Sequence, residues 1–282
     1  MAGKREKKRG RTRLPGILML LAGMAAVLVS AGPAGIAADS PVETPPEQEL
    51  ELVEIPAIEI QEVVPEEEPV VEEPPEPAFP VGLVEAGEPV EDTYFDTVAF
   101  LGDSRTEGFY LYSGLKNGTY YYAVGATVES VFSKDAWETP DGKIPLLDAL
   151  ADTECERIYV MLGVNELGWA KAETFRDQYA KVIDRIRQDH PEAVVVIQSL
   201  LPVSAKQDAK GSYVNNERIQ IYNDLLLKLA EEKDCPYIDS AAAVSDETGC
   251  LRSEWTFDGV HLNVKGCKAW LEYLQTHGVF KN

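Results

Sequence analysis

Short apolar runs alternate with longer segments of helical periodicity between residues 97 and 277, and this alternation most constrains the fold. The runs are rich in Val, Ile, Leu and Tyr, and each is short enough to be one strand buried on both faces. They are residues 97–101, 119–124, 157–162, 193–201 and 236–238. Strands that alternate with helices along a chain form parallel sheets with helices packed on both faces. We therefore predict a three-layer α/β/α sandwich around a parallel sheet of about five strands.

Apolar residues recur at helical spacing in the segments between and after these runs. This spacing predicts helices over residues 171–188 and 215–232. We also predict a helix over residues 105–112, after the first run, and one over residues 264–277, which closes the domain. This arrangement is flavodoxin-like in general plan. Ligands of such sheets bind at the carboxyl ends of the strands, so the residues that directly follow each run are candidates for a functional site.

The first segment of the chain has a different composition. Residues 1–38 hold seven Lys or Arg against one Glu, and they contain an apolar stretch from residue 14 to about residue 31. Basic residues ahead of such a stretch are typical of a secretion signal or a single membrane anchor. Gly35 and Ala37 supply the small residues of a cleavage site, whereas the length of the stretch favours a retained anchor, so both interpretations stay open. We expect the remaining chain to lie outside the cytoplasm, either at the cell membrane or secreted.

The second segment, residues 39–92, is dominated by Pro, Glu and Val and carries eighteen Asp or Glu with no Lys or Arg. It offers too little apolar surface to offset its chain entropy, so we predict an extended, disordered stalk. Residues 93–282 then form a single domain, which we expect to be a monomer. Its net charge of about −10 disfavours nucleic acid as a partner.

Four cysteines lie in the predicted domain, in a compartment where disulfides persist. Cys250 and Cys267 flank one predicted loop, and we expect them to pair. Cys155 and Cys235 each precede a predicted strand and are expected to be buried thiols. No Cys/His spacing typical of zinc is present and no two histidines have ligand spacing, so we expect neither a metal nor a cofactor.

Ser104 follows the first predicted strand, in the sequence Gly102-Asp103-Ser104, and opens a predicted helix. At such a position a serine hydroxyl is exposed, and the first amides of the helix favour developing negative charge. A serine at this position is consistent with a nucleophile and also with an ordinary helix N-cap.

A serine nucleophile needs a base, and the chain has three histidines. His190 and His277 each end a predicted helix, where histidines commonly interact with the helix dipole. His261 lies instead in a loop before the last helix, with Asp258 three residues earlier. One turn brings a carboxylate at that spacing to imidazole Nδ1, which fixes the tautomer while Nε2 takes the serine proton. We predict a catalytic triad of Ser104, His261 and Asp258.

Acyl transfer also needs hydrogen-bond donors where the tetrahedral oxyanion develops. The predicted strand ends supply three: the backbone N–H of Ser104, the backbone N–H of Gly125 and the side-chain amide of Asn165. A turn glycine at 125 and a loop asparagine at 165 are the structural alternatives.

These residues appear in the order Gly102-Asp103-Ser104, Gly125, Gly163-x-Asn165 and Asp258-x-x-His261. The set resembles the four motif blocks of the SGNH (GDSL-like) hydrolases and spans nearly all of the domain, from about residue 96 to 275. The resemblance implies a flavodoxin-like three-layer sheet, a Ser-His-Asp triad drawn from the first and last blocks, and an oxyanion hole made by Ser, Gly and Asn.

Two positions depart from the family pattern. The first block reads GDSRT where many relatives have GDSL, and the third reads GVNE where many have GxND. We expect Asp103, Arg105, Glu166 and Trp255 to bind substrate, although Arg105 and Glu166 are also able to pair with each other.

The resemblance implies a serine esterase acting on O-acylated sugars, lipids or small acyl esters. An extracytoplasmic location favours O-acyl, and above all O-acetyl, esters of cell-wall or extracellular carbohydrate. Two alternatives remain at this point. An O-acyltransferase would use the same site with a sugar hydroxyl in place of water, and a non-catalytic wall-binding module would retain only the fold.

Overall fold

The computed structural model describes residues 77–282. The predicted signal or anchor segment, and the stalk up to residue 76, lie outside the described residues. Within residues 77–282 no helix is both long and apolar enough to cross a membrane. The first and last described residues lie side by side, because Asn282 donates its backbone N–H to Ala78 O (2.9 Å) and its Nδ2 to Pro77 O (2.9 Å).

A six-stranded parallel sheet forms the centre of the fold, in the order β1-β8-β7-β6-β2-β3. Its strands are β1 (Gly82–Leu83), β2 (Val98–Gly102), β3 (Thr119–Tyr122), β6 (Arg157–Met161), β7 (Val194–Gln198) and β8 (Pro236–Ile238). All five residues of β2 and of β7 are buried, as expected for strands covered on both faces. The five predicted strands are therefore confirmed, and the sheet has one strand more than expected.

The additional strand is β1, which pairs with β8 at the edge of the sheet. It lies upstream of residue 93, where we expected the domain to begin, so the folded region includes residues that composition assigned to the stalk. A strand of two residues between prolines and glutamates has no detectable apolar periodicity. Its pairing with Pro236 and Tyr237 defines it instead.

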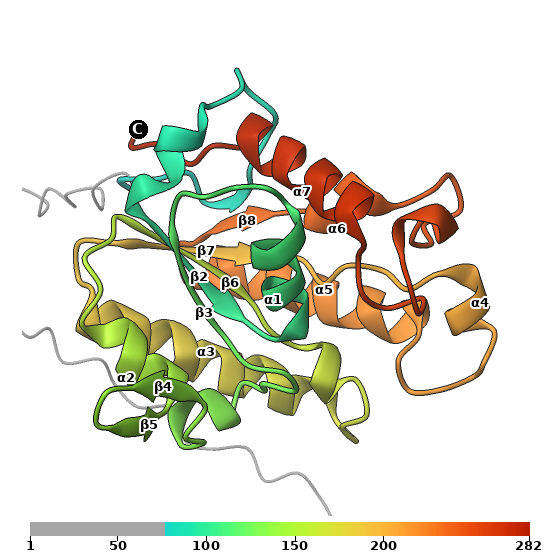
Figure 1. The fold of residues 1–282 in the computed structure, drawn as a ribbon, viewed down its shortest axis with the longest axis horizontal. Helices are drawn as coiled ribbons and strands as arrows, with labels where there is room; N and C mark the ends of the chain where they lie inside the picture. The colour runs from blue at the N-terminus through green and yellow to red at the C-terminus, as the bar shows by residue number, and fades with distance from the viewer. Residues whose placement is uncertain (1–76) are drawn as a thin grey trace, which may run out of the picture. The chain divides into compact units, whose positions relative to one another are not determined.

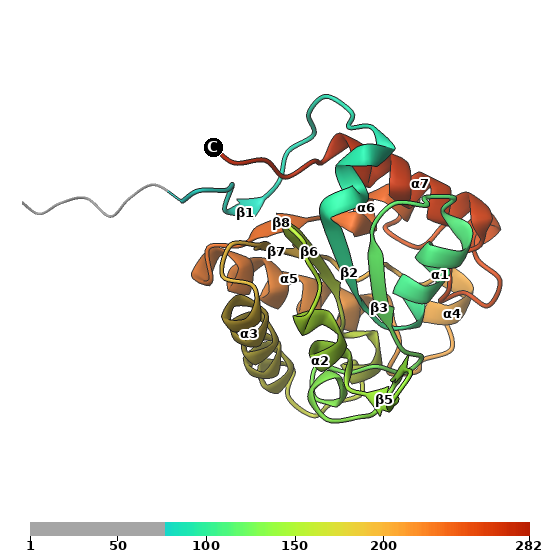
Figure 2. The same ribbon diagram turned by 60° about the vertical axis from the view of Figure 1, so that its left-hand side comes forward.

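Helices cover both faces of the sheet, so the predicted three-layer α/β/α sandwich is confirmed. Figures 1 and 2 show α6 (Ser240–Val244) and α7 (Val264–Thr276) on one side, and α2 (Leu146–Ala151) and α3 (Ala172–Asp189) on the other. Helix α1 (Ser104–Tyr112) packs with α7, and α5 (Asn216–Glu232) packs with α3. The four predicted helices correspond to α1, α3, α5 and α7.

Polar caps set the starts of the helices that follow the strand ends. The carboxylate of Asp103 accepts the N–H of Arg105 at the start of α1 (2.8 Å), and Asn263 accepts the N–H of Lys265 at the start of α7 (2.9 Å). Such caps satisfy amide groups that have no partner within a helix. Asp103 and Asn263 therefore fix the points at which Ser104 and the loop before α7 meet their helices.

Short elements complete the described chain, and periodicity does not reveal them. They are the hairpin β4 (Trp137–Thr139) and β5 (Gly142–Ile144), helix α4 (Ala205–Asp208), and the 3-10 turns η1 (Asp92–Thr97), η2 (Ser130–Phe132), η3 (Val164–Glu166) and η4 (Ser253–Trp255). The turn η3 follows β6 directly and carries Asn165, so it bears on the site described below.

All four cysteines are free thiols, so the expected pairing of Cys250 with Cys267 is wrong. Cys250 Sγ faces α5, where it accepts a hydrogen bond from Asn216 Nδ2 (3.4 Å), whereas Cys267 Sγ on α7 faces Gly108 O of α1 (3.4 Å). The two thiols point toward different elements although their positions in the sequence are close. Burial raises the pKa of Cys267 to about 12 and keeps this thiol protonated.

Candidate active site

Three predicted side chains meet at the carboxyl end of β2. Ser104 is the first residue of α1, and its Oγ lies 2.9 Å from His261 Nε2. His261 Nδ1 lies 2.8 Å from Asp258 Oδ2. The imidazole therefore bridges a hydroxyl and a carboxylate, which is the geometry in which a histidine can accept a serine proton.

The turn that carries Asp258 and His261 is held by its own hydrogen bonds. Asp258 Oδ1 accepts the backbone N–H groups of Val260 and His261, each at 2.8 Å. Thr256 Oγ1 accepts the N–H of Gly259 (2.9 Å) and donates to His261 O (2.7 Å). These bonds occupy one carboxylate oxygen of Asp258 and leave the other for the imidazole.

Electrostatics keep Asp258 ionised. Partial burial acts to raise the pKa of Asp258, but the backbone and imidazole hydrogen bonds of His261 and the N–H of Val260 lower it to about 2. The carboxylate is therefore negative at all but strongly acidic pH. A negative Asp258 stabilises positive charge on the imidazole beside it.

The other two histidines lie elsewhere, as their sequence positions suggest. His190 follows α3, and its Nε2 lies 3.1 Å from Leu150 O. His277 follows α7, stacks on Tyr273 with ring centroids 3.8 Å apart, and has its Nδ1 2.7 Å from Tyr273 O. Neither imidazole contacts Ser104.

The predicted oxyanion donors come from three neighbouring strand ends, because β2 lies between β3 and β6 in the sheet. The N–H of Ser104 begins a helix and has no partner within it. Gly125 has a φ of +75°, which favours glycine, and its N–H donates no hydrogen bond among the described residues. Asn165 Nδ2 donates one hydrogen to Ala126 O (2.8 Å), and its second hydrogen remains available.

A pocket of about 380 Å³ opens beside Ser104 and His261. Apart from these two and Asp258, its lining combines apolar side chains with one carboxylate: Glu107, Gly108, Leu111, Tyr112, Val124, Phe257 and Leu262. Val124 and Phe257 are more than two-thirds exposed. None of these seven residues is among the predicted site residues, although most are close in sequence to a motif residue.

Three side chains expected to bind substrate are buried instead. Asp103 and Glu166 are fully buried and Arg105 is 3% exposed, so none of them faces the pocket, and that expectation is corrected. Arg105 Nη1 donates to Leu201 O (2.7 Å). The sequence also allowed an ion pair between Arg105 and Glu166. Both residues lie in the described part of the chain, and they form no such pair there.

Burial shifts the ionisation of all three groups. It raises the pKa of Asp103 and, reinforced by the negative charge of Asp103, raises that of Glu166 to about 8. It lowers the pKa of Arg105 to about 10, so the guanidinium stays charged. One oxygen of each carboxyl group, Asp103 Oδ2 and Glu166 Oε2, has no hydrogen-bond partner in the described part of the chain.

Trp255, the fourth side chain expected to bind substrate, lies on η4 and does not line the pocket beside Ser104. It is partly buried, and the guanidinium of Arg252 lies over its ring, 5.1 Å from the centroid. We therefore correct this expectation also, because Trp255 packs within the loop region before α7.

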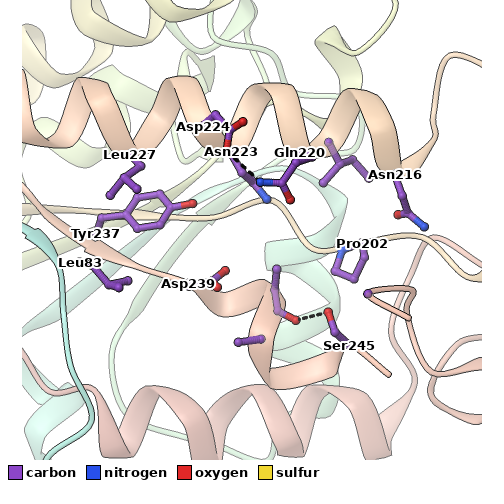
Figure 3. A pocket seen from close by; sticks show the side chains of 14 residues that line it. Leu83, Pro202, Asn216, Gln220, Asn223, Asp224, Leu227, Tyr237, Asp239 and Ser245 are labelled. Carbon is purple, nitrogen blue, oxygen red and sulfur yellow. Dashed lines mark hydrogen bonds between the residues drawn. The ribbon is translucent and has the colours of Figure 1, made fainter. Parts of the chain in front are cut away.

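A separate pocket of about 310 Å³ lies between α5 and the segment from β8 to α6 (Figure 3). Tyr237, Asp239, Asn223 and Asp224 line it, and Figure 3 shows Leu83 and Leu227 at one end. It contains none of the predicted site residues.

Within residues 77–282, no three His, Cys, Asp or Glu side chains are grouped so as to hold a metal ion.

Comparison with known proteins identifies the family. The model of the GDSL-like Lipase/Acylhydrolase family matches residues 100–269, which is more than half of the chain. The chain belongs to this family. The matched span includes every residue of the SGNH motif set, from Gly102 to His261. As a GDSL-like protein, it is a serine hydrolase of carboxylic esters, and its sandwich fold is that of the family.

Individual GDSL-like relatives are distant. The isoamyl acetate-hydrolyzing esterase of Saccharomyces cerevisiae is 22% identical over 201 residues, which cover 64% of this chain and 84% of the yeast protein. A solved structure from Streptococcus pneumonia, assigned as a platelet activating factor, superposes with a TM-score of 0.53 at 23% identity, covering 63% of this chain and 81% of that one. A GDSL-like lipase from Bacteroides thetaiotaomicron gives a TM-score of 0.48 at 16% identity, covering 67% and 90%.

Proposed function

We propose that this GDSL-like hydrolase is an extracytoplasmic esterase that removes O-acyl groups, chiefly O-acetyl groups, from cell-wall or extracellular carbohydrate. The observation that carries the proposal is the continuous chain of contacts from Ser104 Oγ through His261 to Asp258, with distances of 2.9 and 2.8 Å. Ser104, His261 and Asp258 also line a pocket at the molecular surface, where a substrate can reach them.

The proposed reaction begins with acyl transfer to the enzyme. Ser104 Oγ attacks the ester carbonyl carbon while His261 Nε2 takes the hydroxyl proton, and the ionised Asp258 stabilises the resulting imidazolium. The tetrahedral intermediate collapses when the C–O bond to the sugar breaks and His261 returns its proton to the leaving oxygen. The sugar alcohol departs, and the acyl group remains on Ser104.

Hydrolysis completes the cycle. His261 removes a proton from water, whose oxygen attacks the acyl carbon. The second intermediate collapses when the bond from carbon to Ser104 Oγ breaks and His261 returns its proton to Oγ, which releases the carboxylic acid and restores the hydroxyl. In both steps the negative carbonyl oxygen accepts hydrogen bonds from the N–H groups of Ser104 and Gly125 and from Asn165 Nδ2. Each such donor contributes roughly 3 kcal/mol in comparable sites.

Three observations support a small acyl group on a larger alcohol. Val124 and Phe257 line the pocket and are mostly exposed to solvent, so an extended leaving group can remain outside the pocket. Tyr112 and Phe257 form an edge-to-face pair with centroids 6.2 Å apart at its rim, and exposed aromatic rings of this kind stack on sugar faces. The yeast relative carries a name that refers to an acetate ester.

The proposed location rests on the sequence alone. Seven basic residues precede an apolar stretch near the start of the chain, and an acidic, Pro-rich segment follows. An enzyme held outside the cell on such a segment meets glycan polymers and has no route to cytosolic metabolites. Fractionation of cells that express the full chain, with antibody detection of residues 77–282, tests this part of the proposal.

Acetate release tests the activity. The wild-type protein is compared with the variants Ser104→Ala and His261→Ala. Each is incubated with O-acetylated xylan, O-acetylated peptidoglycan or p-nitrophenyl acetate, and the released acetate is quantified. We expect release by the wild type only, with a glycan preferred over the simple ester in kcat/KM. Labelling of the wild type but not of Ser104→Ala by a fluorophosphonate is also expected. A wild type that is neither labelled nor active would contradict the proposal.

A further inference from the structure

Two consecutive residues after β6 hold the loop after β3 at two points. Asn165 Nδ2 donates to Ala126 O (2.8 Å), and the backbone N–H of Val128 donates to Glu166 Oε1 (2.6 Å). The loop between these contacts begins next to Gly125, whose N–H is a proposed oxyanion donor. Because β2 lies between β3 and β6, the two contacts pass across the strand end that carries Ser104.

Glu166 is itself firmly held. Its backbone carbonyl accepts hydrogen bonds from Tyr222 Oη on α5 (2.6 Å) and from the N–H of Trp169 (2.8 Å). Its side chain is fully buried, and its backbone N–H donates to Gly163 O (3.2 Å). The carboxyl group therefore has a fixed position relative to the sheet, and the Val128 N–H that it accepts is fixed in turn.

A fully buried glutamate side chain is unusual in a protein interior. Placing a carboxyl group in the interior is unfavourable unless all its polar atoms find partners. Glu166 makes one side-chain hydrogen bond in the described part of the chain, and Oε2 makes none. Apolar residues would fill the same space at lower cost, but an apolar side chain could not bind the Val128 N–H.

We propose that Glu166 is a positioning residue of the active site, which holds the loop 125–128 so that the Gly125 N–H points at the oxyanion. This inference rests on the proposed function of Ser104 and Gly125. Glu166 acts through Val128 and touches no substrate, because its side chain is absent from the pocket lining. Its loss would leave Asn165 as the only one of these two residues that binds the loop through its side chain, and we expect transition-state binding to weaken more than substrate binding.

Two variants of Glu166 test the proposal. Glu166→Gln keeps an oxygen that can accept the Val128 N–H, whereas Glu166→Ala removes it. For p-nitrophenyl acetate we expect Glu166→Ala to lower kcat at least tenfold and to change KM by less than about threefold. The loss of kcat should be smaller than the roughly 10²–10³-fold loss that follows deletion of an oxyanion donor. Glu166→Gln should retain kcat within about threefold. Glu129→Ala is the matched control, because Glu129 is exposed and lies in the same loop region.

Active-site titration separates positioning from folding. Each variant is titrated with a fluorophosphonate to count competent Ser104 groups, and kcat is expressed per titrated site. A kcat deficit of Glu166→Ala that persists per titrated site, with rescue in Glu166→Gln, supports positioning. Two results would overturn the proposal. One is a kcat of Glu166→Ala that equals the wild-type value per titrated site, and the other is an equal loss of kcat in Glu166→Ala and Glu166→Gln. Failure of the proposed function is a distinct result, since the wild type would then show no labelling.

Discussion

Asp258 binds His261 twice, once through each carboxylate oxygen. Oδ2 contacts the imidazole Nδ1 and Oδ1 accepts the backbone N–H of the same residue, both at 2.8 Å. One side chain thus sets the position of the backbone and the orientation of the ring. The orientation of the His261 ring should therefore depend on the chemistry of the Oδ2 position, even when the turn of residues 256–261 is retained.

Asp258→Asn tests this sensitivity. Asparagine can still accept the backbone N–H groups, but its Nδ2 would donate toward imidazole Nδ1 and favour the tautomer that cannot accept the Ser104 proton. We expect kcat for p-nitrophenyl acetate to fall by roughly 10³–10⁴-fold with little change in the unfolding midpoint. Asp246→Asn is the control, because Asp246 also accepts backbone N–H groups within a turn but lies outside the site. Activity of Asp258→Asn within tenfold of wild type would contradict the assignment.

The buried carboxyl group of Glu166 makes stability depend on pH. Its pKa is about 8 in the folded protein against an ordinary value of 4.5, so between these values the folded state keeps a proton that the unfolded state releases. Raising the pH through this window therefore favours unfolding, by at most roughly 1.4 kcal/mol per pH unit for one group. Urea unfolding of wild type and Glu166→Gln at pH 5.5 and 8.5 checks this. We expect the wild type to lose stability relative to Glu166→Gln at pH 8.5. If the difference in the free energy of unfolding between the two proteins is the same at both pH values, the pKa of Glu166 is not raised.

Gly108 lies inside helix α1 and lines the pocket beside Ser104. A Cβ at this position would meet no atom within 4 Å, so packing within the protein does not require glycine. Gly108→Ala should raise the free energy of unfolding by up to about 1 kcal/mol because alanine favours the helix. The added methyl group narrows the pocket, so kcat/KM should fall more for p-nitrophenyl octanoate than for p-nitrophenyl acetate. Gly87→Ala is the control, because a Cβ at Gly87 would also meet no atom within 4 Å but Gly87 lies outside the pocket. An equal fall in kcat/KM for the two esters in Gly108→Ala would argue against a substrate-facing role.

Gly259 follows Asp258 in the turn that carries His261 and has a φ of +92°. A Cβ there would lie 2.6 Å from Ser204 Oγ and 2.9 Å from Gln207 Cβ, so a side chain would displace the turn from α4. We expect Gly259→Ala to lower the free energy of unfolding by roughly 1–3 kcal/mol and to reduce kcat. Gly249→Ala shares the positive φ of +79° without a steric contact and should cost stability but not activity. Equal activity losses in the two variants would mean that the position of the turn is unimportant.

The sequence predicts the fold, and the proximity of Ser104, His261 and Asp258, for a physical reason. Strands buried on both faces leave continuous apolar runs, and the long helices α3, α5 and α7 leave a clear periodicity. The side chains that meet in the site are polar, so they are expected at the surface or in hydrogen bonds. They also lie directly after predicted strands or in loops between predicted elements, and they are Ser104, His261 and Asp258.

Other features depend on contacts between distant residues, which no local pattern records. The edge strand β1 exists only through its pairing with β8, and the separation of Cys250 from Cys267 depends on which helix each thiol faces. Arg105 and Glu166 follow motif residues directly, yet they point into the interior. Their burial results from the packing of the strand ends, and the same is true of the contact between Glu166 and Val128.

The pairing of Asn282 with Pro77 and Ala78 has a practical consequence. Residues 82 and 83 run parallel to the start of β8, so residue 77 and the last residue both lie toward the amino ends of the strands, whereas Ser104 lies at a carboxyl end. A surface support or a fusion partner joined at either position would be attached on the side of the sheet away from the pocket. Immobilised forms of the enzyme should therefore keep access to substrates as large as insoluble polymers.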